Sequence, residues 1–213
     1  MDFKQLLQEL LPRVQKPARY LGNEWNAVKK DHHGVAAKAV LAFPDLYEVG
    51  MSNLGLQILY EAVNCHEDLL LERTFAPAAD MESLMRHYEL PLFSLESCLP
   101  VKEFDLLGFS LQYELSFTNV LNMLDLAGIP LYADRRRDEP LVIGGGPAAF
   151  NPEPLASFFD LFLLGDGEEA FPEILRRWSE LSRQGAGRQE ILLDLSAQPG
   201  VYVPSLYRPV YSG

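Results

Sequence analysis

The sequence predicts an α/β fold in which helices cover both faces of a mostly parallel sheet. Short apolar segments of strand length alternate along the chain with amphipathic segments of ten or more residues. The strands of a parallel sheet are buried on both faces, so they read as nearly continuous apolar runs. Five such strands in this alternation predict a doubly wound, Rossmann-like sheet of the flavodoxin type.

The chain opens with a predicted helix followed by an irregular arm. Apolar residues recur at helical spacing from Phe3 to Val14, and this pattern ends before Pro17. The segment 16–33 shows no clear period. Residues 1–35 are therefore expected to form an N-terminal helix and an arm that lies over the main body.

The remaining apolar pattern predicts strands and helices in alternation. Strands are expected at 38–43, 69–75, 105–111, 141–143 and 161–164. Helices are expected at 53–64, 79–88, 115–127, 168–182 and 188–195. Leu54, Ile58, Leu59 and Val63 share the expected apolar side of the first of these helices. The segment 92–95 stays open between a short extra strand and a loop.

These elements place one α/β domain at residues 36–198. The tail at 199–213 has two X-Pro bonds, at Pro204 and Pro209, and little apolar periodicity. It is expected to be a linker toward a further domain.

Composition excludes several classes of function. The chain has 213 residues, with 18 Lys and Arg against 30 Asp and Glu, so its formal net charge is −12. Proteins that bind nucleic acid neutralise phosphates with a basic face, and this charge balance opposes such a role. No direct nucleic-acid partner is expected.

Cysteine usage and the N-terminus point to a soluble, cytoplasmic protein. Cys65 and Cys98 are the two cysteines, too few for a disulfide-rich scaffold, a four-cysteine zinc site or a three-cysteine iron–sulfur motif. The first residues lack the pattern of a signal peptide, and no apolar run approaches the ~20 residues of a membrane helix. Adjacent His32 and His33 point in different directions, so no metal site is expected there.

Three loops that follow predicted strands carry the candidate chemistry. In an open parallel sheet, ligands bind beyond the carboxyl ends of the strands, where the winding reverses. Glycines in such loops let the backbone approach a ligand closely, and the next helix turns its N–H groups toward it. The loops are 44–53 (PDLYEVGMSN), 110–114 (SLQYE) and 144–148 (GGGPA).

Each loop also has a purely structural interpretation, which the residues alone leave open. Asp45 is as well suited to cap a turn as to contact a ligand, and Tyr47 is as consistent with a packed aromatic as with a ligand neighbour. Gly145 is expected either to leave room for a ligand or to supply a positive φ for a turn.

The order of the loops resembles the cobalamin-binding module of B12 enzymes. In that module a DxHxxG loop, an SxL loop and a GG strand follow one another, and here DLYEVG at 45–50, SLQ at 110–112 and GGG at 144–146 match them. More specifically, the chain resembles the N-terminal region of B12-binding radical SAM proteins over most of 19–207. The stretches that carry this resemblance are RYLGNEWN (19–26), FPDLYEVGMSNLG (43–55), GFSLQYELSFTNVLNMLDLAGIP (108–130), GGGPAAFNPEP (144–154), GDGEEAFPEIL (165–175) and GVYVPSLY (200–207).

The resemblance implies a corrinoid site at these loops. The residues that it implies for cofactor binding are Asp45, Tyr47, Gly50, Met51, Ser52, Asn53, Ser110, Gln112, Tyr113, Gly144, Gly145, Gly146 and Pro147. Two positions depart from the family pattern: Tyr47 stands where the family has its axial histidine, and Gln112 replaces the leucine of SxL. A phenol with an ordinary pKa near 10 is a poor cobalt ligand, so cobalamin would bind without a protein histidine.

The resemblance also implies a catalytic domain that this chain does not contain. Neither cysteine lies in a motif that could hold a [4Fe–4S] cluster, so cluster and S-adenosylmethionine belong to a radical SAM domain of the same polypeptide. The chain is expected to be the N-terminal part of a longer radical SAM enzyme and to catalyse nothing by itself. Two alternatives remain: a degenerate B12-like module used only for docking, and a flavin- or nucleotide-binding flavodoxin-like domain.

Overall fold

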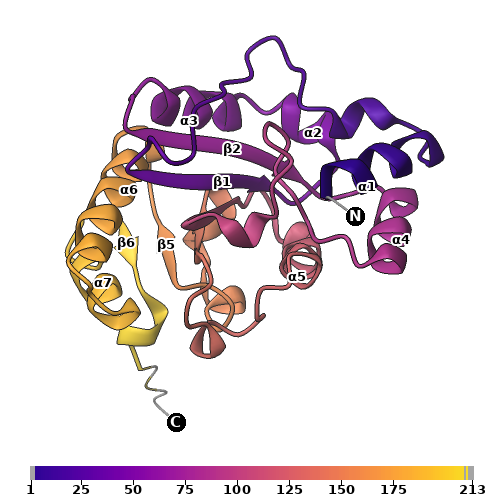
Figure 1. The fold of residues 1–213 in the computed structure, drawn as a ribbon. Coiled ribbons are helices and arrows are strands. Elements are labelled where there is room, and N and C mark those ends of the chain that lie inside the picture. The colour runs from indigo at the N-terminus through magenta and orange to yellow at the C-terminus, as the bar shows by residue number, and fades with distance from the viewer. Residues whose placement is uncertain (1–2, 209, 211–213) are drawn as a thin grey trace.

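Six strands form one sheet in the computed structural model, which describes residues 3–208 and 210 (Figure 1). They are β1 (Ala37–Phe43), β2 (Leu69–Phe75), β3 (Leu106–Ser110), β4 (Leu141–Gly145), β5 (Leu161–Leu163) and β6 (Val201–Tyr202). Their order across the sheet is β2-β1-β3-β4-β5-β6; β6 is antiparallel to β5, and every other pair is parallel. This order confirms the predicted doubly wound class and puts the switch point between β1 and β3.

Helices cover both faces of this sheet. They are α1 (Phe3–Leu10), α2 (Tyr47–Met51), α3 (Leu54–Asn64), α4 (Ala79–Tyr88), α5 (Phe117–Leu126), α6 (Gly167–Arg183) and α7 (Arg188–Leu195). Buried residues of α1, α4 and α5 share one core cluster, and those of α3, α6 and α7 share a second. Strand β1 separates the two, because Val40 and Ala42 face the first cluster while Ala39 and Leu41 face the second.

One expectation about the elements needs correction, and one open assignment is decided. The sheet has a sixth strand, since Val201–Tyr202, within the expected linker, pairs with β5. The segment 92–95 is not a strand; Phe93 makes an isolated bridge to Pro100. Pro209 and residues 211–213 of the expected linker lie outside the described residues.

Helix α3 exposes part of the side that its sequence predicts to be apolar and buried. Its buried residues are Leu56, Tyr60, Val63 and Asn64, whereas Leu54 and Ile58 are exposed. The helix carries apolar residues on more than one side, and the sheet covers only one of them. Leu54 and Ile58 therefore contribute to the apolar surface of the molecule.

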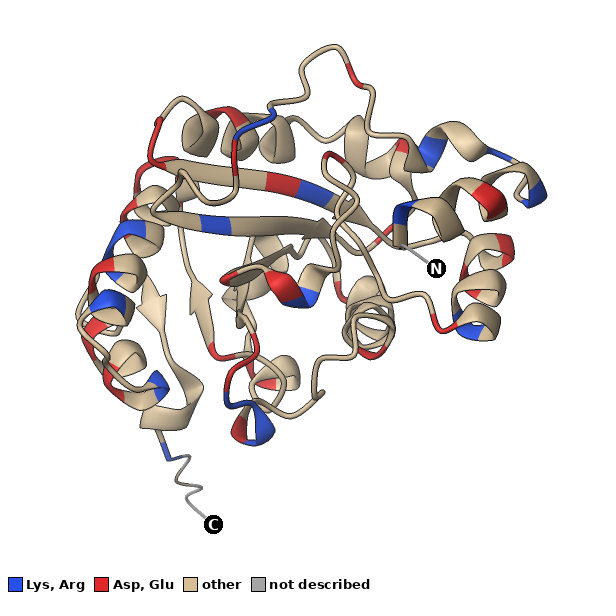
Figure 2. Ribbon diagram, in the orientation of Figure 1, with Lys and Arg blue, Asp and Glu red and all other residues tan. Residues whose placement is uncertain are grey.

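Side chains cover the outer edge of β2. Asn64 binds both backbone groups of Leu71, its amide donating to the carbonyl at 2.8 Å and its oxygen accepting from the N–H at 3.1 Å. Glu96 accepts from the backbone N–H of Arg73 at 2.8 Å and from its guanidinium at 2.7 Å. Figure 2 shows the adjacent acidic and basic residues of β2, Glu72 and Arg73. These contacts satisfy an edge that could otherwise pair with another strand.

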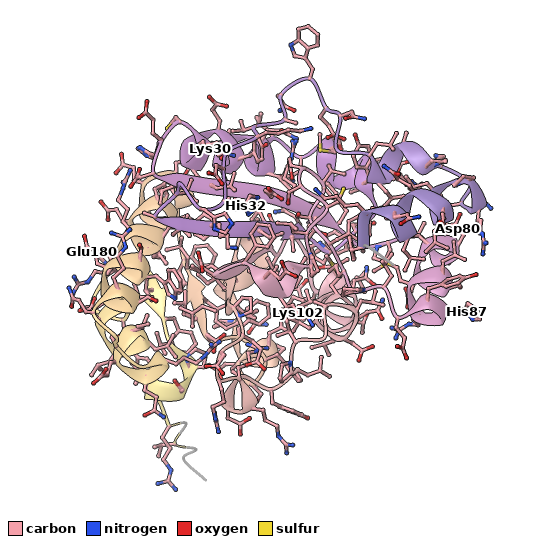
Figure 3. All side chains as sticks on the ribbon, in the orientation of Figure 1. Lys30, His32, Asp80, His87, Lys102 and Glu180 are labelled. Atoms are coloured by element: carbon pink, nitrogen blue, oxygen red, sulfur yellow. The ribbon has the colours of Figure 1, made fainter. Side chains whose placement is uncertain are left out.

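The N-terminal arm lies across this edge and is held by polar contacts. The Lys30 ammonium donates to three backbone oxygens, those of Asn64, His66 and Leu69, at 2.6–2.9 Å. His32 Nε2 lies 2.9 Å from a carboxylate oxygen of Glu72. Figure 3 labels Lys30 and His32 on this segment beside the sheet. No helix in the described part of the chain is both long and apolar enough to cross a membrane.

Candidate functional site

The three candidate loops meet at the carboxyl edge of the sheet. Strands β1, β3 and β4 are parallel and end at Phe43, Ser110 and Gly145. Ser110 lies opposite Gly145 in the register of β3 and β4. The structure therefore brings Asp45, Ser110 and Gly145 to one edge, at and beside the switch point, where doubly wound folds bind ligands.

Hydrogen bonds between the loops close this edge. The Tyr113 hydroxyl donates to one oxygen of Asp45 at 2.6 Å, and the backbone N–H of Leu46 donates to the other at 2.7 Å. The hydrogen bond to Asp45 raises the pKa of Tyr113, because the carboxylate favours the protonated phenol. The Gln112 amide donates to Ser110 Oγ at 2.9 Å. Both oxygens of Asp45 thus have partners within the chain.

The polar groups at the end of α2 and the start of α3 form hydrogen bonds to residues nearby in the sequence. Asn53 caps α3, since its side-chain oxygen accepts from the N–H of Leu56 at 2.9 Å. Ser52 Oγ donates to the Val49 carbonyl at 2.8 Å, and the Met51 carbonyl accepts from Gln57 at 3.2 Å. Gly50 packs so closely on Phe75 that a Cβ there would lie 2.3 Å from the ring. These positions have structural roles whether or not a ligand binds nearby.

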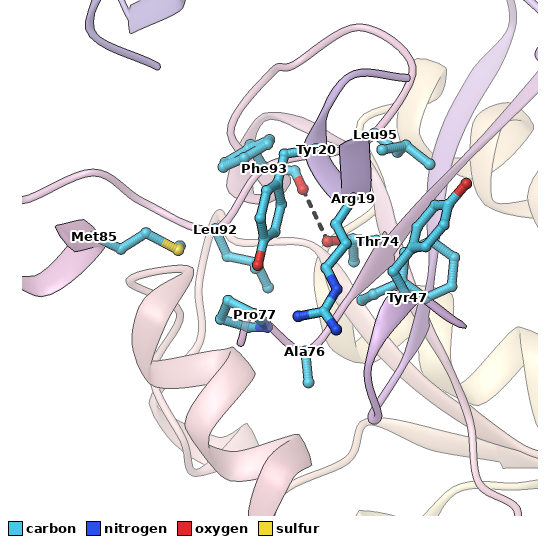
Figure 4. A pocket seen from close by; sticks show the side chains of 11 residues that line it. Arg19, Tyr20, Tyr47, Thr74, Ala76, Pro77, Met85, Leu92, Phe93 and Leu95 are labelled. Carbon is cyan, nitrogen blue, oxygen red and sulfur yellow. Dashed lines mark hydrogen bonds between the residues drawn. The ribbon is translucent and has the colours of Figure 1, made fainter. Parts of the chain in front are cut away.

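Tyr47 points toward the arm. Its hydroxyl donates to Glu24 Oε1 at 2.9 Å, and its ring packs edge-on against Phe75 with centroids 5.4 Å apart. Burial, followed by the hydrogen bond to Glu24, raises the pKa of Tyr47 to about 12. The residue lines a small, partly open pocket with Arg19, Tyr20 and Phe93 (Figure 4). It is a packed aromatic that anchors the arm.

The glycine run differs from position to position. Gly144 and Gly145 are the last residues of β4, and Gly146 leaves it with φ +96°, immediately before the 3₁₀ turn that begins at Pro147. A Cβ at Gly144 would lie 2.7 Å from Phe162, and one at Gly146 would lie 2.8 Å from the Leu111 carbonyl. A Cβ at Gly145 would meet only the Leu163 carbonyl, at 3.7 Å. The positive φ expected at Gly145 belongs to Gly146 instead.

These residues do not fit a corrinoid in the present conformation. Phe162 and Leu111 fill the space beside Gly144 that a nucleotide tail would need. The hollow at the switch point, lined by Phe43, Asp45 and Tyr113 among others, has no room even for a water molecule. The tyrosine at the axial-ligand position is engaged elsewhere. The space beside Gly145 stays open.

Exposed apolar side chains surround the same edge. We define the edge patch as Val49, Leu54, Tyr113, Leu115 and Phe150. All five lie in segments that follow β1, β3 or β4. Leu115 is 86% exposed, Leu54 72% and Phe150 70%. Because these strands are parallel, the segments all leave the same edge of the sheet, and large exposed apolar side chains at such an edge are candidates for an interaction site.

Comparison with known proteins decides the family. The sequence profile of "Radical SAM proteins, N-terminal" matches residues 55–204. The chain belongs to this family. The matched range contains β2 to β6 together with the loops after β3 and β4, so membership covers most of the sheet.

One relative is much longer than this chain. An uncharacterized protein of Methanocaldococcus jannaschii is 23% identical over 142 residues, which are 64% of this chain and 26% of the relative. The chain therefore spans about a quarter of that relative's length. No solved structure gives a significant match.

The edge patch was missing from the sequence-based candidate list, apart from Tyr113. Leu54 and Leu115 fall within predicted helices, where apolar residues are expected to face the core. From sequence alone, Leu115 and Phe150 could have been recognised as candidates only because they lie in the segments that follow β3 and β4. Within residues 3–208 and 210, no group of three or more His, Cys, Asp or Glu side chains could hold a metal ion.

Proposed function

We propose that this chain is a non-catalytic accessory domain of a radical SAM enzyme, and that its edge patch contacts the catalytic domain of the same polypeptide. The observation that carries the proposal is the edge patch itself. It combines strongly exposed apolar side chains with an edge whose polar groups are already paired to one another. An apolar surface fits a protein partner better than it fits a polar small molecule.

Membership in the family supports the choice of partner. The profile describes the N-terminal part of radical SAM proteins, and the archaeal relative has three quarters of its length beyond the region of similarity. Reductive cleavage of S-adenosylmethionine needs a thiolate-held [4Fe–4S] cluster, which this chain's two cysteines do not provide. The accessory domain would position or shield that catalytic domain.

The test is site-specific photo-crosslinking in the full-length enzyme. A photoreactive phenylalanine analogue replaces Leu115 in the edge patch or, as the matched control, Leu193, which is 62% exposed on α7. The proposal predicts crosslinks from position 115 to peptides of the catalytic domain and none from position 193. Equal crosslinking from both positions, or none from position 115, would refute it.

A second candidate is corrinoid binding at the same edge. Its support is the convergence of Asp45, Ser110 and Gly145 at one sheet edge, with open space beside Gly145. Binding would require Phe162 and Leu111 to move away from Gly144. Anaerobic titration with hydroxocobalamin, read by absorbance and gel filtration, should then show one equivalent bound by the native chain and none by Gly145→Val. Absence of binding by the native chain would leave docking as the function of this edge.

A further inference from the structure

The arm presents a fully exposed tryptophan. The Trp25 side chain is fully exposed, at 105% of the value for an isolated tryptophan residue, and Leu21 on the same segment is 46% exposed. Both belong to the RYLGNEWN stretch at 19–26, which the proposed contact at the sheet edge does not use. An indole exposed in this way gives up the burial that normally favours tryptophan in a folded chain.

Several contacts hold the segment around Trp25 in place. On one side, Glu24 accepts a hydrogen bond from the Tyr47 hydroxyl at 2.9 Å, and Gly22, at φ +61°, packs against the Leu95 carbonyl. On the other side, the Asn26 amide donates to Gln57 at 3.1 Å and the Val28 N–H donates to the Tyr60 hydroxyl at 2.7 Å. The flanking residues turn inward while Trp25 turns outward. A tryptophan presented by a pre-ordered loop loses little entropy when a partner covers it.

The same contacts tie the segment next to Trp25 to a part of α3 that carries exposed apolar residues. Gln57, the partner of Asn26, lies between Leu54 and Ile58, which are 72% and 40% exposed. We define the arm patch as Leu21, Trp25, Leu54 and Ile58. Leu54 also belongs to the edge patch, so the two patches share a residue at the start of α3. Tryptophan is the residue most enriched among those that dominate binding energy at protein interfaces.

We propose that the arm patch is a second contact of the catalytic domain, with Trp25 as its anchor. The inference rests on the proposed function, since it extends the same interface along α3 onto the arm. The shared residue Leu54 favours the partner that covers the edge patch over an unrelated one. The length of the archaeal relative beyond the matched region is enough for a further domain.

Hydroxyl-radical footprinting tests this inference in the full-length enzyme, with the 213-residue chain as the exposed reference. We expect Trp25 and Ile58 to be oxidised more slowly in the full-length enzyme and Leu193 to be oxidised equally in both. Trp25→Ala should weaken docking about 30-fold, the cost of losing an interface anchor. Ile58 should then be oxidised at the rate of the reference chain.

The outcomes separate this inference from the proposed function. Trp25 oxidised equally in both proteins, while position 115 still crosslinks, would refute the arm contact and leave the edge contact standing. Protection of Trp25 in the 213-residue chain that increases with concentration would show that a second copy covers it, and would also refute the inference. Loss of both signals would refute the proposed function itself.

Discussion

At the scale of single residues, Gly22 shows where the fold needs a glycine. It has φ +61°, and a Cβ there would lie only 1.9 Å from the backbone oxygen of Leu95. Gly128, after α5, has a similar φ of +65° but nothing within 4 Å of its Cβ position. Gly128→Ala should therefore lower the unfolding free energy by about 1 kcal/mol, because alanine is strained in the left-handed conformation. Gly22→Ala should lower it by about 2–4 kcal/mol, because its Cβ would also displace the backbone at Leu95. Urea unfolding of both variants measures this, and equal costs would contradict the close packing of the arm.

The raised pKa of Tyr47 makes the unfolding free energy depend on pH in the alkaline range. Burial and the hydrogen bond to Glu24 raise its pKa from 10 to about 12 in the folded chain. The folded state thus binds this proton more tightly than the unfolded state, so the stabilisation is complete below pH 10 and is lost as pH rises toward 12. Tyr47→Phe should reduce the slope of unfolding free energy against pH in that window. Tyr202→Phe should act similarly, because its hydrogen bond to Glu153 raises the pKa of Tyr202 to about 12. An unchanged slope in Tyr47→Phe would exclude the buried hydrogen bond.

At the scale of elements, Lys30 determines whether the arm stays on the sheet. Its ammonium donates to three backbone oxygens around the end of α3 and the start of β2, and burial lowers its pKa. Lys30→Met should lower the unfolding free energy by about 1–3 kcal/mol, the scale of hydrogen bonds from a charged group. It should also speed hydrogen exchange in residues 21–33 while leaving β3 and β4 unchanged. Lys29→Met, at an exposed neighbouring position, is the control and should change neither.

The elements also show where sequence patterns succeed and fail. Strand β2 and helix α4 begin and end at the predicted residues, because continuous apolar runs and helical spacing are local signals. The buried side of α3 was predicted only in part: Val63 is buried and Leu59 packs against the core, but Leu54 and Ile58 are exposed, since the sheet decides which of several apolar stripes it covers. Strand β6 has only two residues and pairs with β5, so no local period announces it. Gly200, which precedes β6, has φ +78° and packs against the Leu164 carbonyl. The need for a glycine there depends on this contact, which the sequence does not show.

At the scale of the whole molecule, the candidate site follows partly from topology. Parallel strands must bring their carboxyl ends to one edge, so the meeting of Asp45, Ser110 and Gly145 could be predicted from the order of elements. What fills that edge could not. Phe162 reaches Gly144 from a neighbouring strand, and Tyr113 reaches Asp45 across 68 positions of sequence. These contacts turn an expected ligand site into a closed edge surrounded by exposed apolar residues.

Hydrogen exchange reports directly on the proposed contact between this edge and a catalytic domain. The full-length enzyme and the 213-residue chain would be compared peptide by peptide. We expect slower exchange in the full-length enzyme for residues 110–117 and 146–151, the segments that carry Tyr113, Leu115 and Phe150, and no change for residues 188–195 of α7. Identical exchange of the edge segments in the two proteins would contradict this contact.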